Sequence, residues 1–292
     1  MQIVDSAFTI CSLALAYSLV GINLYLTSKV LKVTDLTCDG SFAVGGCAYG
    51  ALVVGGLNPI AAFIIAILAG FAAGLITSSL STHLKMGTIL SSMVTITIIH
   101  AFINESINFA NSGANINLKN ALNSISPLTV FITIAVIVGI IVAFFYKVID
   151  SEYGLAMRLC GNGKIISKSL GIDSQRMYLT GIAVGNGLSA IAGALAAQAT
   201  GVFSTTMGIG TFVFGFSCVL ISERFFNTKS AKQALIGCIT IAVIYRAIMG
   251  LIITRGEYSL GSEYSGLMLA VILIIFVALK DADKQKTDMD NV

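Results

Sequence analysis

Residues 151–176 read SEYGLAMRLCGNGKIISKSLGIDSQR, the longest polar interruption of the chain that carries several basic residues. The pattern predicts a short amphipathic helix, a break at residues 161–163, a second short helix and a turn at residues 171–173. Long apolar segments lie directly on both sides of this loop. A compact, basic and structured loop between apolar segments is typical of a region that contacts a soluble partner.

The composition indicates a membrane protein. The 292-residue chain is 56% hydrophobic and 11% charged, whereas soluble proteins have roughly 25% charged residues. Too few charges are present to cover a water-soluble globule, and apolar runs of about 20 residues repeat along the chain. Strands of an outer-membrane barrel would alternate over about ten residues instead. The fold class is therefore predicted to be all-α and polytopic.

The apolar runs predict nine transmembrane spans, with approximate bounds 8–28, 42–56, 60–79, 88–103, 128–146, 177–199, 202–221, 234–253 and 260–279. No Lys or Arg precedes Lys29, so we expect no cleavable signal peptide. Placing the 151–176 loop inside puts 14 of the 17 basic residues inside and only Lys119 and Arg255 outside. This predicts an outside N-terminus and an inside C-terminus.

The domain organisation follows from the same pattern. Residues 1–292 are expected to form a single transmembrane domain, with a disordered, charged tail from about residue 281. Small residues recur at four-residue spacing in three spans, as Gly46/Gly50, Gly70/Gly74 and Gly181/Gly185. In lipid such faces mark tightly packed helix pairs. Packing within the chain and a seam between two copies both remain open.

The segment 35–41 (DLTCDGS) places acidic and hydroxyl side chains between two apolar spans. A plain cytoplasmic connection would account for it. The alternative is a broken helix beside a permeation path, where freed backbone groups face a water-filled cavity. In that case the residues lining the path are Asp35, Thr37, Asp39, Gly40 and Ser41.

Arg246 lies deep in the eighth predicted span, next to Tyr245. A charge there costs roughly 2.5–3.5 kcal/mol, so it is expected to face the bundle interior with a partner. A structural ion pair or a position on the path are both open, with Asp35, Asp39 or Glu223 as candidate partners. Asn186, in the middle of the sixth predicted span, is expected to hydrogen-bond between helices.

The chain contains no pattern for covalent chemistry. The six cysteines form no C-x-x-C pair, and His83 and His100 belong to no metal-ligand pattern. A phosphate-cradling G-x-x-x-x-G-K-[ST] motif is missing, so the chain is not itself an ATPase. We expect no catalytic residues, no metal, no cofactor and no nucleic-acid partner.

The 151–176 loop has the composition of a rigid knob for a groove on another subunit. Leu155, Leu159, Ile165, Ile166 and Leu170 supply apolar positions, and Arg158, Lys164 and Lys168 surround them with positive charge. Such a knob converts closure of an ATPase dimer into movement of membrane helices. A basic loop that faces anionic lipids is the alternative.

This loop resembles the coupling segment of permeases of the branched-chain amino acid and ribose type, from bacterial ABC importers. These permeases carry a Gly-x-Ala-x-Arg-Ala-x-Gly-x-Asn-like stretch followed by Gly-Ile. The matching residues are Gly154, Ala156, Arg158, Gly161, Asn162, Gly171 and Ile172, while Cys160 stands where alanine is usual. The resemblance implies contact with an ATPase subunit between Arg158 and Gly171, which includes Lys164 and Lys168.

Further matches resemble a subgroup of uncharacterised permeases within that family. Residues 35–41 are similar to its Asp-Leu-Thr-x-Asp-Gly-Ser motif, which implies a place beside the translocation path. Residues 83–86 and the Tyr245-Arg246 pair also match, whereas residues 263–265 depart from the pattern because a lysine is common there. Some subgroup members work with binding proteins for aromatic amino acids, which implies an amino-acid cargo.

The sequence therefore predicts the permease subunit of an ABC importer in the bacterial inner membrane, moving a small solute by alternating access. The implied partners are a cytoplasmic ATP-binding subunit, an extracytoplasmic substrate-binding protein, a second permease copy in a homodimer, and the lipid bilayer. The alternative is a stand-alone secondary transporter that uses Asp35, Asp39 and Arg246 as ion-coupling charges. A membrane scaffold without transport activity is a third possibility.

Overall fold

The computed structural model describes residues 2–109, 115–117, 126–226 and 231–255. The chain divides into two compact units, residues 1–247 and 248–292. Of the second unit, the structure describes residues 248–255, which form the end of helix α10. The predicted ninth span (260–279) and the predicted tail from residue 281 lie outside the described residues. The single-domain organisation remains a prediction.

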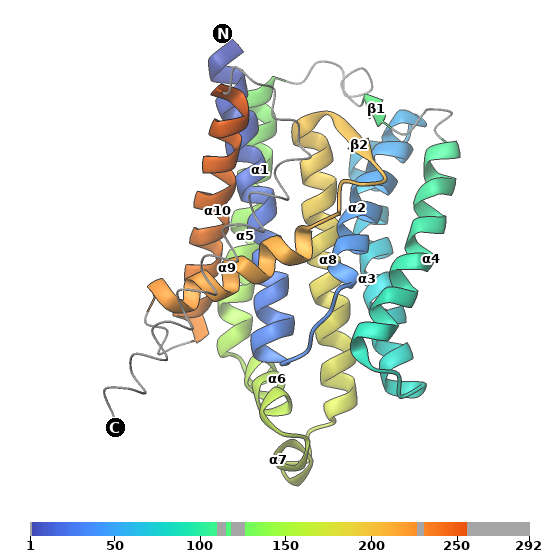
Figure 1. The fold of residues 1–292 in the computed structure, drawn as a ribbon, viewed down its shortest axis with the longest axis vertical. Coiled ribbons are helices and arrows are strands. Elements are labelled where there is room, and N and C mark those ends of the chain that lie inside the picture. The colour runs from blue at the N-terminus through green and yellow to red at the C-terminus, as the bar shows by residue number, and fades with distance from the viewer. Residues whose placement is uncertain (1, 110–114, 118–125, 227–230, 256–292) are drawn as a thin grey trace, which may run out of the picture. The chain divides into compact units, whose positions relative to one another are not determined.

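The described chain is almost entirely helical, as predicted (Figure 1). Seven of its helical segments are long and apolar enough to cross a membrane. The elements are α1 (Gln2–Tyr25), η1 (Leu26–Val30), α2 (Thr37–Val54), α3 (Pro59–His83), α4 (Thr88–Phe109), β1 (Asn115–Asn117), α5 (Pro127–Asp150), α6 (Glu152–Asn162), α7 (Lys164–Ser169), α8 (Ser174–Thr200), β2 (Val202–Ser204), α9 (Thr211–Phe225) and α10 (Ala231–Arg255).

Local sequence sets the helix boundaries. Helices α3 and α5 begin with proline in the first turn, where the missing N–H has no intrahelical partner to lose. Asn58 accepts a hydrogen bond from the Ile60 N–H at 2.9 Å and caps α3. Asp173 caps α8 by accepting from the Gln175 and Arg176 N–H groups. Helix α8 ends at Gly201, whose φ of 69° suits glycine.

Helices α2 and α8 are the most enclosed membrane-crossing helices, and α8 packs against α1, α2 and α3. Close backbone approach requires glycine at these contacts. A Cβ at Gly45 would overlap the Ala190 backbone, and one at Gly193 would overlap the Phe42 carbonyl. Because small residues allow helices to gain dispersion contacts in lipid, this helix pair forms the centre of the bundle.

The predicted small-residue faces pack within the chain. Gly70 and Gly74 face α8, where a Cβ at Gly74 would meet the Ala183 Cα at 2.6 Å. Gly46 and Gly50 face Met207 and Phe203, in the segment between α8 and α9. The third pair, Gly181/Gly185, faces Leu31 and Asn23. Intrachain packing is thus confirmed for all three pairs, and these glycines are not free to form a seam between copies.

The second span begins earlier than predicted. Helix α2 starts at Thr37 rather than near residue 42, so residues 37–41 form its first turn and a half. Figure 1 shows the chain turning back upward from the lower end of η1 and entering α2 at about mid-height. Lys32 makes the reversal with a φ of 55°. Helix α2 therefore begins inside the bundle, whereas the place of residues 35–41 beside a permeation path stays a prediction.

A continuous seventh span over residues 202–221 is wrong. The chain instead forms β2, a series of turns, and then the 15-residue helix α9, which lies across the bundle (Figure 1). At 1.5 Å per residue, α9 is about 22 Å long and shorter than a membrane core of about 30 Å. Gly208 and Gly210 break the span, because Gly208 packs on the Asp39 carbonyl and Gly210 has a φ of 86°.

The connection between α4 and α5 contributes strand β1, although residues 104–109 of the predicted 104–126 loop belong to α4. Strand β1 pairs antiparallel with β2, with Ile116 opposite Phe203. Phe203 is only 1% exposed and packs in the hydrophobic core around α2 and α3. The ladder therefore ties the α4–α5 connection to the α8–α9 connection.

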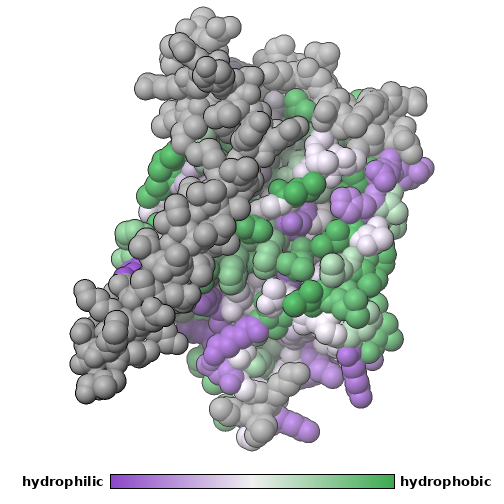
Figure 2. Space-filling model, in the orientation of Figure 1, coloured by the Kyte–Doolittle hydropathy of each residue, from purple (hydrophilic) through white to green (hydrophobic). Residues whose placement is uncertain are grey.

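The opposite end of the bundle gathers the predicted inside loops. The Tyr178 hydroxyl near the start of α8 donates to Ser81 of α3 at 3.1 Å and lies 3.1 Å from the Thr88 hydroxyl of α4. Figure 1 places α6 and α7 at this same end. On the face in Figure 2, hydrophobic residues predominate across the middle and hydrophilic residues gather toward the lower end. This arrangement suits a membrane-embedded bundle.

The α2–α8 contact generates a stability prediction. We expect Gly193→Ala to destabilise the protein by about 2 kcal/mol or more, since its methyl group would meet the Phe42 carbonyl, which cannot move without shifting α2. Thermal unfolding in mild detergent measures the change. Gly139→Ala on α5 is the matched control, because a Cβ there meets no atom within 4 Å. Equal melting temperatures for the two variants would contradict the close contact between Gly193 of α8 and Phe42 of α2.

Candidate functional site

The start of α2 carries a buried carboxylate. Asp35 is 1% exposed and lies just before the helix. Its Oδ1 accepts from the Thr37 N–H at 2.9 Å and from the Ser92 hydroxyl of α4 at 3.1 Å. Its Oδ2 accepts from the Asn186 amide of α8 at 2.7 Å. These donors offset much of the cost of removing the carboxylate from water.

Asn186 extends this cluster with both ends of its amide. Its Nδ2 donates to Asp35 and, at 3.0 Å, to the Ile182 carbonyl. Its Oδ1 accepts from the Ser41 hydroxyl at 2.7 Å. Asn186 and Ser41 are fully buried, so the predicted role of Asn186 as a hydrogen-bonding link between helices is confirmed.

Thr37 completes the cluster toward α3. Its hydroxyl lies 2.8 Å from that of Thr77, and both side chains are fully buried. The cluster of Asp35, Thr37, Ser41, Thr77, Ser92 and Asn186 thus joins four helices: α2, α3, α4 and α8. By helical rise, Ser92 lies about 6 Å and Asn186 about 18 Å from the starts of their helices. The cluster is therefore inside the bundle rather than at its surface.

Asp39 connects α2 to α9. Its Oδ1 accepts from the Thr211 hydroxyl at 2.6 Å and from the Phe212 N–H at 2.5 Å. Its Oδ2 accepts from the Gly210 N–H at 3.4 Å. A carboxylate at a helix N-terminus satisfies free N–H groups and opposes the positive end of the helix dipole. Asp39 therefore caps α9 from another helix.

The predicted path residues occupy different surroundings. Asp35, Thr37 and Ser41 share the buried cluster, Asp39 caps α9, and Gly40 packs against the Ile99 side chain of α4. All five face neighbouring helices in this conformation. Sequence reasoning found these residues but not their partners Thr77, Ser92 and Thr211, because a hydroxyl in an apolar helix usually bonds to its own backbone.

Arg246 has a different partner from those predicted. Its guanidinium lies over the Tyr17 ring of α1, 3.9 Å from the ring centroid. Tyr17 packs in turn against Phe42 and Phe214. The expected carboxylates are engaged elsewhere, with Glu223 2.5 Å from the Lys29 ammonium. A cation over a desolvated tyrosine ring gains about 2 kcal/mol, which offsets part of the burial cost.

The 151–176 loop forms the two short helices that were predicted. Helix α6 ends at Asn162, and α7 starts at Lys164 after a break in the helix at Gly163. Gly154 packs against the carbonyls that end α5, and Gly161 packs against the Val30 carbonyl of η1. A Cβ at either position would overlap backbone, so the glycines of the motif place α6 directly on the bundle.

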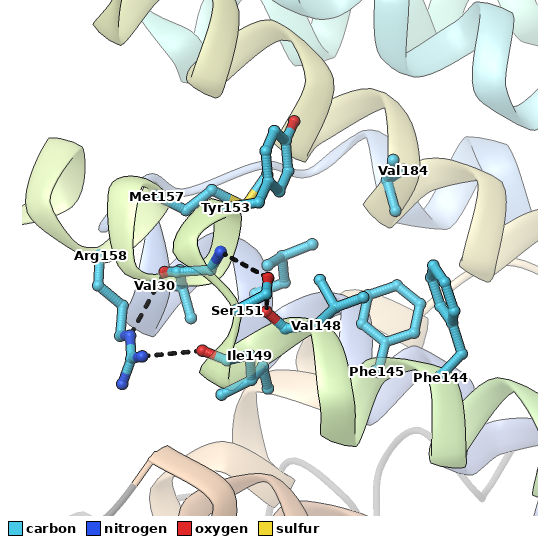
Figure 3. A pocket seen from close by; sticks show the side chains of 12 residues that line it. Val30, Phe144, Phe145, Val148, Ile149, Ser151, Tyr153, Met157, Arg158 and Val184 are labelled. Atoms are coloured by element: carbon cyan, nitrogen blue, oxygen red, sulfur yellow. Dashed lines mark hydrogen bonds between the residues drawn. The ribbon is translucent and has the colours of Figure 1, made fainter. Parts of the chain in front are cut away.

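Arg158 holds this arrangement from within the chain (Figure 3). Its Nη2 donates to the Ile149 carbonyl at 2.8 Å and its Nε donates to the Gly154 carbonyl at 3.4 Å. The Ile149 carbonyl is near the C-terminus of α5, where a cation is favourable. Arg158 therefore fastens α6 to α5, and its predicted contact with an ATPase subunit stays a prediction.

The outer side of α6 and α7 remains available for contact. Leu155 is 52% exposed, Leu170 is 62% exposed, and Lys168 and Asn162 are also exposed. Ala156 is half-buried, and Gly171 turns the chain with a φ of 73°. The side chain of Lys164 lies outside the described part of the chain. Beyond this, the Tyr153 hydroxyl forms a hydrogen bond with Thr180, which links α6 to α8.

The buried cluster generates a second stability prediction. We expect Asn186→Leu to cost about 3 kcal/mol, because it leaves the Asp35 carboxylate and the Ser41 hydroxyl without a buried partner. Asp35→Asn combined with Asn186→Asp keeps an amide–carboxylate pair and should recover part of the loss. Denaturant unfolding in detergent measures both.

Thr97→Ala is the control for this experiment. The Thr97 hydroxyl is exposed and bonds to the Met93 carbonyl of its own helix, so we expect a change below about 0.5 kcal/mol. The Asp35→Asn and Asn186→Asp single variants are measured beside the exchanged double variant. If the loss of stability in the double variant equalled the sum of the two single losses, the Asp35–Asn186 contact would not stabilise the fold.

Comparison with known proteins shows which family the sequence matches. Residues 6–277 match the family model described as branched-chain amino acid transport system / permease component. The chain is 28% identical over 266 residues to the tyrosine transport system permease protein of Clostridioides difficile, covering 91% of this chain and 88% of the relative. It is 22% identical over 268 residues to an uncharacterized protein of Rickettsia prowazekii, covering 90% and 93%. No solved structure matches.

The family match covers nearly the whole chain and agrees with the membrane-spanning helices. Permease components of this kind are not themselves enzymes. The chain is therefore a multi-pass protein of the bacterial inner membrane, and it belongs to the branched-chain amino acid permease family of ABC transporters.

Proposed function

We propose that this permease imports an amino acid, with an aromatic amino acid as the first candidate, by alternating access. The cargo class is supported by the relative named as a tyrosine transport permease. Energy would come from a separate cytoplasmic ATP-binding subunit, since the chain has no phosphate-cradling motif. An extracytoplasmic binding protein would deliver the cargo, and a second copy of the chain would complete the channel.

The observation that carries this proposal is the construction of the α6–α7 loop. Its inner side is fastened to α5 by Arg158 and Gly154 and to α8 by Tyr153. Its outer side presents Leu155 and Leu170. An ATPase that grips the outer side would therefore move the ends of two membrane helices together. A loop that served only as a connection would need no such fastening.

The translocation path is proposed to follow the starts of α2 and α9. Both helices begin inside the bundle, and Asp39 joins them. Movement of α8 would act on the start of α2 through Asn186, so that Asp35, Thr37, Gly40 and Ser41 would move together beside the path. Arg246 would lie beside the same path. Broken helices with polar ends inside a membrane are found at substrate sites of transporters.

The ion-coupled secondary carrier receives less support. Its coupling charges would have to gain and lose partners during transport. Asp35 and Asp39 accept hydrogen bonds from neutral hydroxyl, amide and backbone groups, and Arg246 lies over an aromatic ring. These contacts are typical of charges that hold helices in place.

Docking of the ATPase generates the main functional prediction. We expect Leu155→Asp and Leu170→Asp each to lower co-purification of the ATP-binding subunit about tenfold or more. The loss of one apolar anchor is expected to cost about 1.4 kcal/mol of binding free energy, which is a tenfold loss of affinity. Uptake of labelled tyrosine should fall in parallel. The tagged chain is isolated from its native membrane, and a co-purifying protein with a phosphate-binding motif is quantified by mass spectrometry.

Ile209→Asp is the matched control, because Ile209 is 76% exposed in the connection between β2 and α9. It should retain the ATP-binding subunit. Recovery of the chain without any such subunit, even after cross-linking, would exclude the ABC-importer proposal. Retention of the subunit by both loop variants would remove α6 and α7 from the interface.

Orientation generates a further prediction. With its native cysteines replaced by alanine, the Lys168→Cys variant should react with a membrane-impermeant maleimide only in inverted vesicles. The Thr206→Cys variant should react in intact cells, because its segment lies at the β1–β2 end of the bundle. Both positions are exposed. The reverse pattern would place α6 and α7 outside and contradict the charge distribution.

A further inference from the structure

An apolar pocket lies between α6 and the bundle (Figure 3). Its volume is about 250 Å³. Phe144 and Phe145 of α5, Val184 of α8, and Leu26 and Val30 of η1 form its walls. Residues of α6, Met157 and Arg158 among them, form the remaining wall. The pocket therefore lies beneath the helix that is proposed to meet the ATPase.

Water is a poor occupant of this pocket. A buried water molecule needs two to four polar partners, and the lining is almost entirely carbon. The Tyr153 hydroxyl is bonded to Thr180, and the Ser151 hydroxyl donates to the Val148 carbonyl at 2.6 Å. An apolar cavity of about 150 Å³ already binds benzene. A pocket of this size therefore suits a hydrocarbon chain of several methylene groups.

The outer surface of α5 leads into the pocket. Exposed apolar residues recur every four positions along this helix, and Phe144 is the last of them. The stripe consists of Leu128, Ile132, Val136, Ile140 and Phe144, which are 48% to 65% exposed. In a membrane such a stripe faces acyl chains. The pocket therefore continues a surface that is suited to lipid.

Positive charge follows where this apolar stripe ends. Lys147 is exposed and comes three residues after Phe144, on the same side of α5 by helical spacing. Arg158 lines the pocket, and among the described residues it directs two of its five N–H groups to the Ile149 and Gly154 carbonyls. The nearby Asp150 carboxylate is paired with Lys232 at 2.5 Å. An apolar surface followed by Lys147 and Arg158 is therefore complementary to an anionic phospholipid.

We propose that this pocket binds one acyl chain of an anionic phospholipid from the inner leaflet, with the lipid phosphate beside Arg158 and Lys147. The chain fills the space between α5, α8 and α6, and the headgroup neutralises the cations at the loop. Arg158 then contacts α5 and the lipid together. If the ATP-binding subunit docks on the outer side of α6 as proposed, the lipid supports that helix from its inner side.

The test uses the full chain in nanodiscs of phosphatidylcholine with a small share of phosphatidylglycerol. The phosphatidylglycerol carries a photoactivatable diazirine on one acyl chain, and labelled peptides are identified by mass spectrometry. We expect labelling to concentrate on residues 144–157 and around Val184. The readout requires no transport, so it remains informative even if the chain proves to carry a different cargo or to lack an ATP-binding partner.

Graded substitutions fill the pocket. Val184→Leu should lower this labelling about fourfold, the effect of displacing one buried methylene group. Val184→Phe should lower it at least about 15-fold, the effect of displacing two. Ile132→Phe, on the exposed stripe of α5, is the control and should label like the unchanged chain. Size-exclusion chromatography verifies the fold of each variant, and the Leu variant suffices if the Phe variant aggregates.

Arg158→Gln tests the headgroup. We expect it to reduce the preference for phosphatidylglycerol over phosphatidylcholine about fivefold, the contribution of one basic residue near a charged lipid. Labelling spread evenly along α5, or unchanged in the Val184 variants, would overturn the proposal. Cross-linking of the pocket residues to a protein in native membranes would also overturn it, because the occupant would then be a partner subunit.

Discussion

The hydrogen bond between the Asp35 carboxylate and the Asn186 amide is the contact on which the centre of this bundle depends. A carboxylate at 1% exposure is tolerated only when donors replace its water, and Thr37, Ser92 and Asn186 supply them from three helices. Because each donor belongs to a different helix, the charge defines how those helices meet. Glycines at the α2–α8 contact then allow the backbones to approach closely enough to bury the cluster.

Two helices begin inside the bundle, and their first turns create most of the polar chemistry there. A helix start leaves N–H groups without partners, which is costly where water is absent. Asp35 serves the start of α2, and Asp39 on α2 serves the start of α9. The two aspartates of the same short motif therefore have different roles. One joins α2 to its neighbours, and the other makes α9 follow any displacement of α2.

Helix α6 is fixed firmly to the end of the bundle. Helix α6 rests on α5 and η1 through two glycines, and Arg158 bonds to the end of α5. The residues that make the motif recognisable are thus mainly those that fasten the loop to its own chain. If the exposed leucines bind an ATPase as proposed, this fastening would carry its movement to α5. Cargo-dependent movement of the membrane helices and nucleotide-dependent movement of a partner would meet at this helix.

The sequence by itself determined which segments are helices, because apolar runs, proline starts and glycine breaks act over a few residues. Of the eight predicted spans that fall within the described residues, six lie close to the observed helices. The sequence also marked Asp35, Asp39, Asn186 and Arg246 as unusual polar groups in an apolar setting. Only the tertiary structure decided their partners. Thr77, Ser92 and Thr211 look in the sequence like ordinary hydroxyls in apolar segments. Arg246 lies over the Tyr17 ring, although the sequence offered three carboxylates as its partner. The early start of α2 and the short α9 were decided in the same way. Hydropathy measures the average environment of a window, whereas a break inside the bundle depends on donors supplied by helices more than 50 residues away.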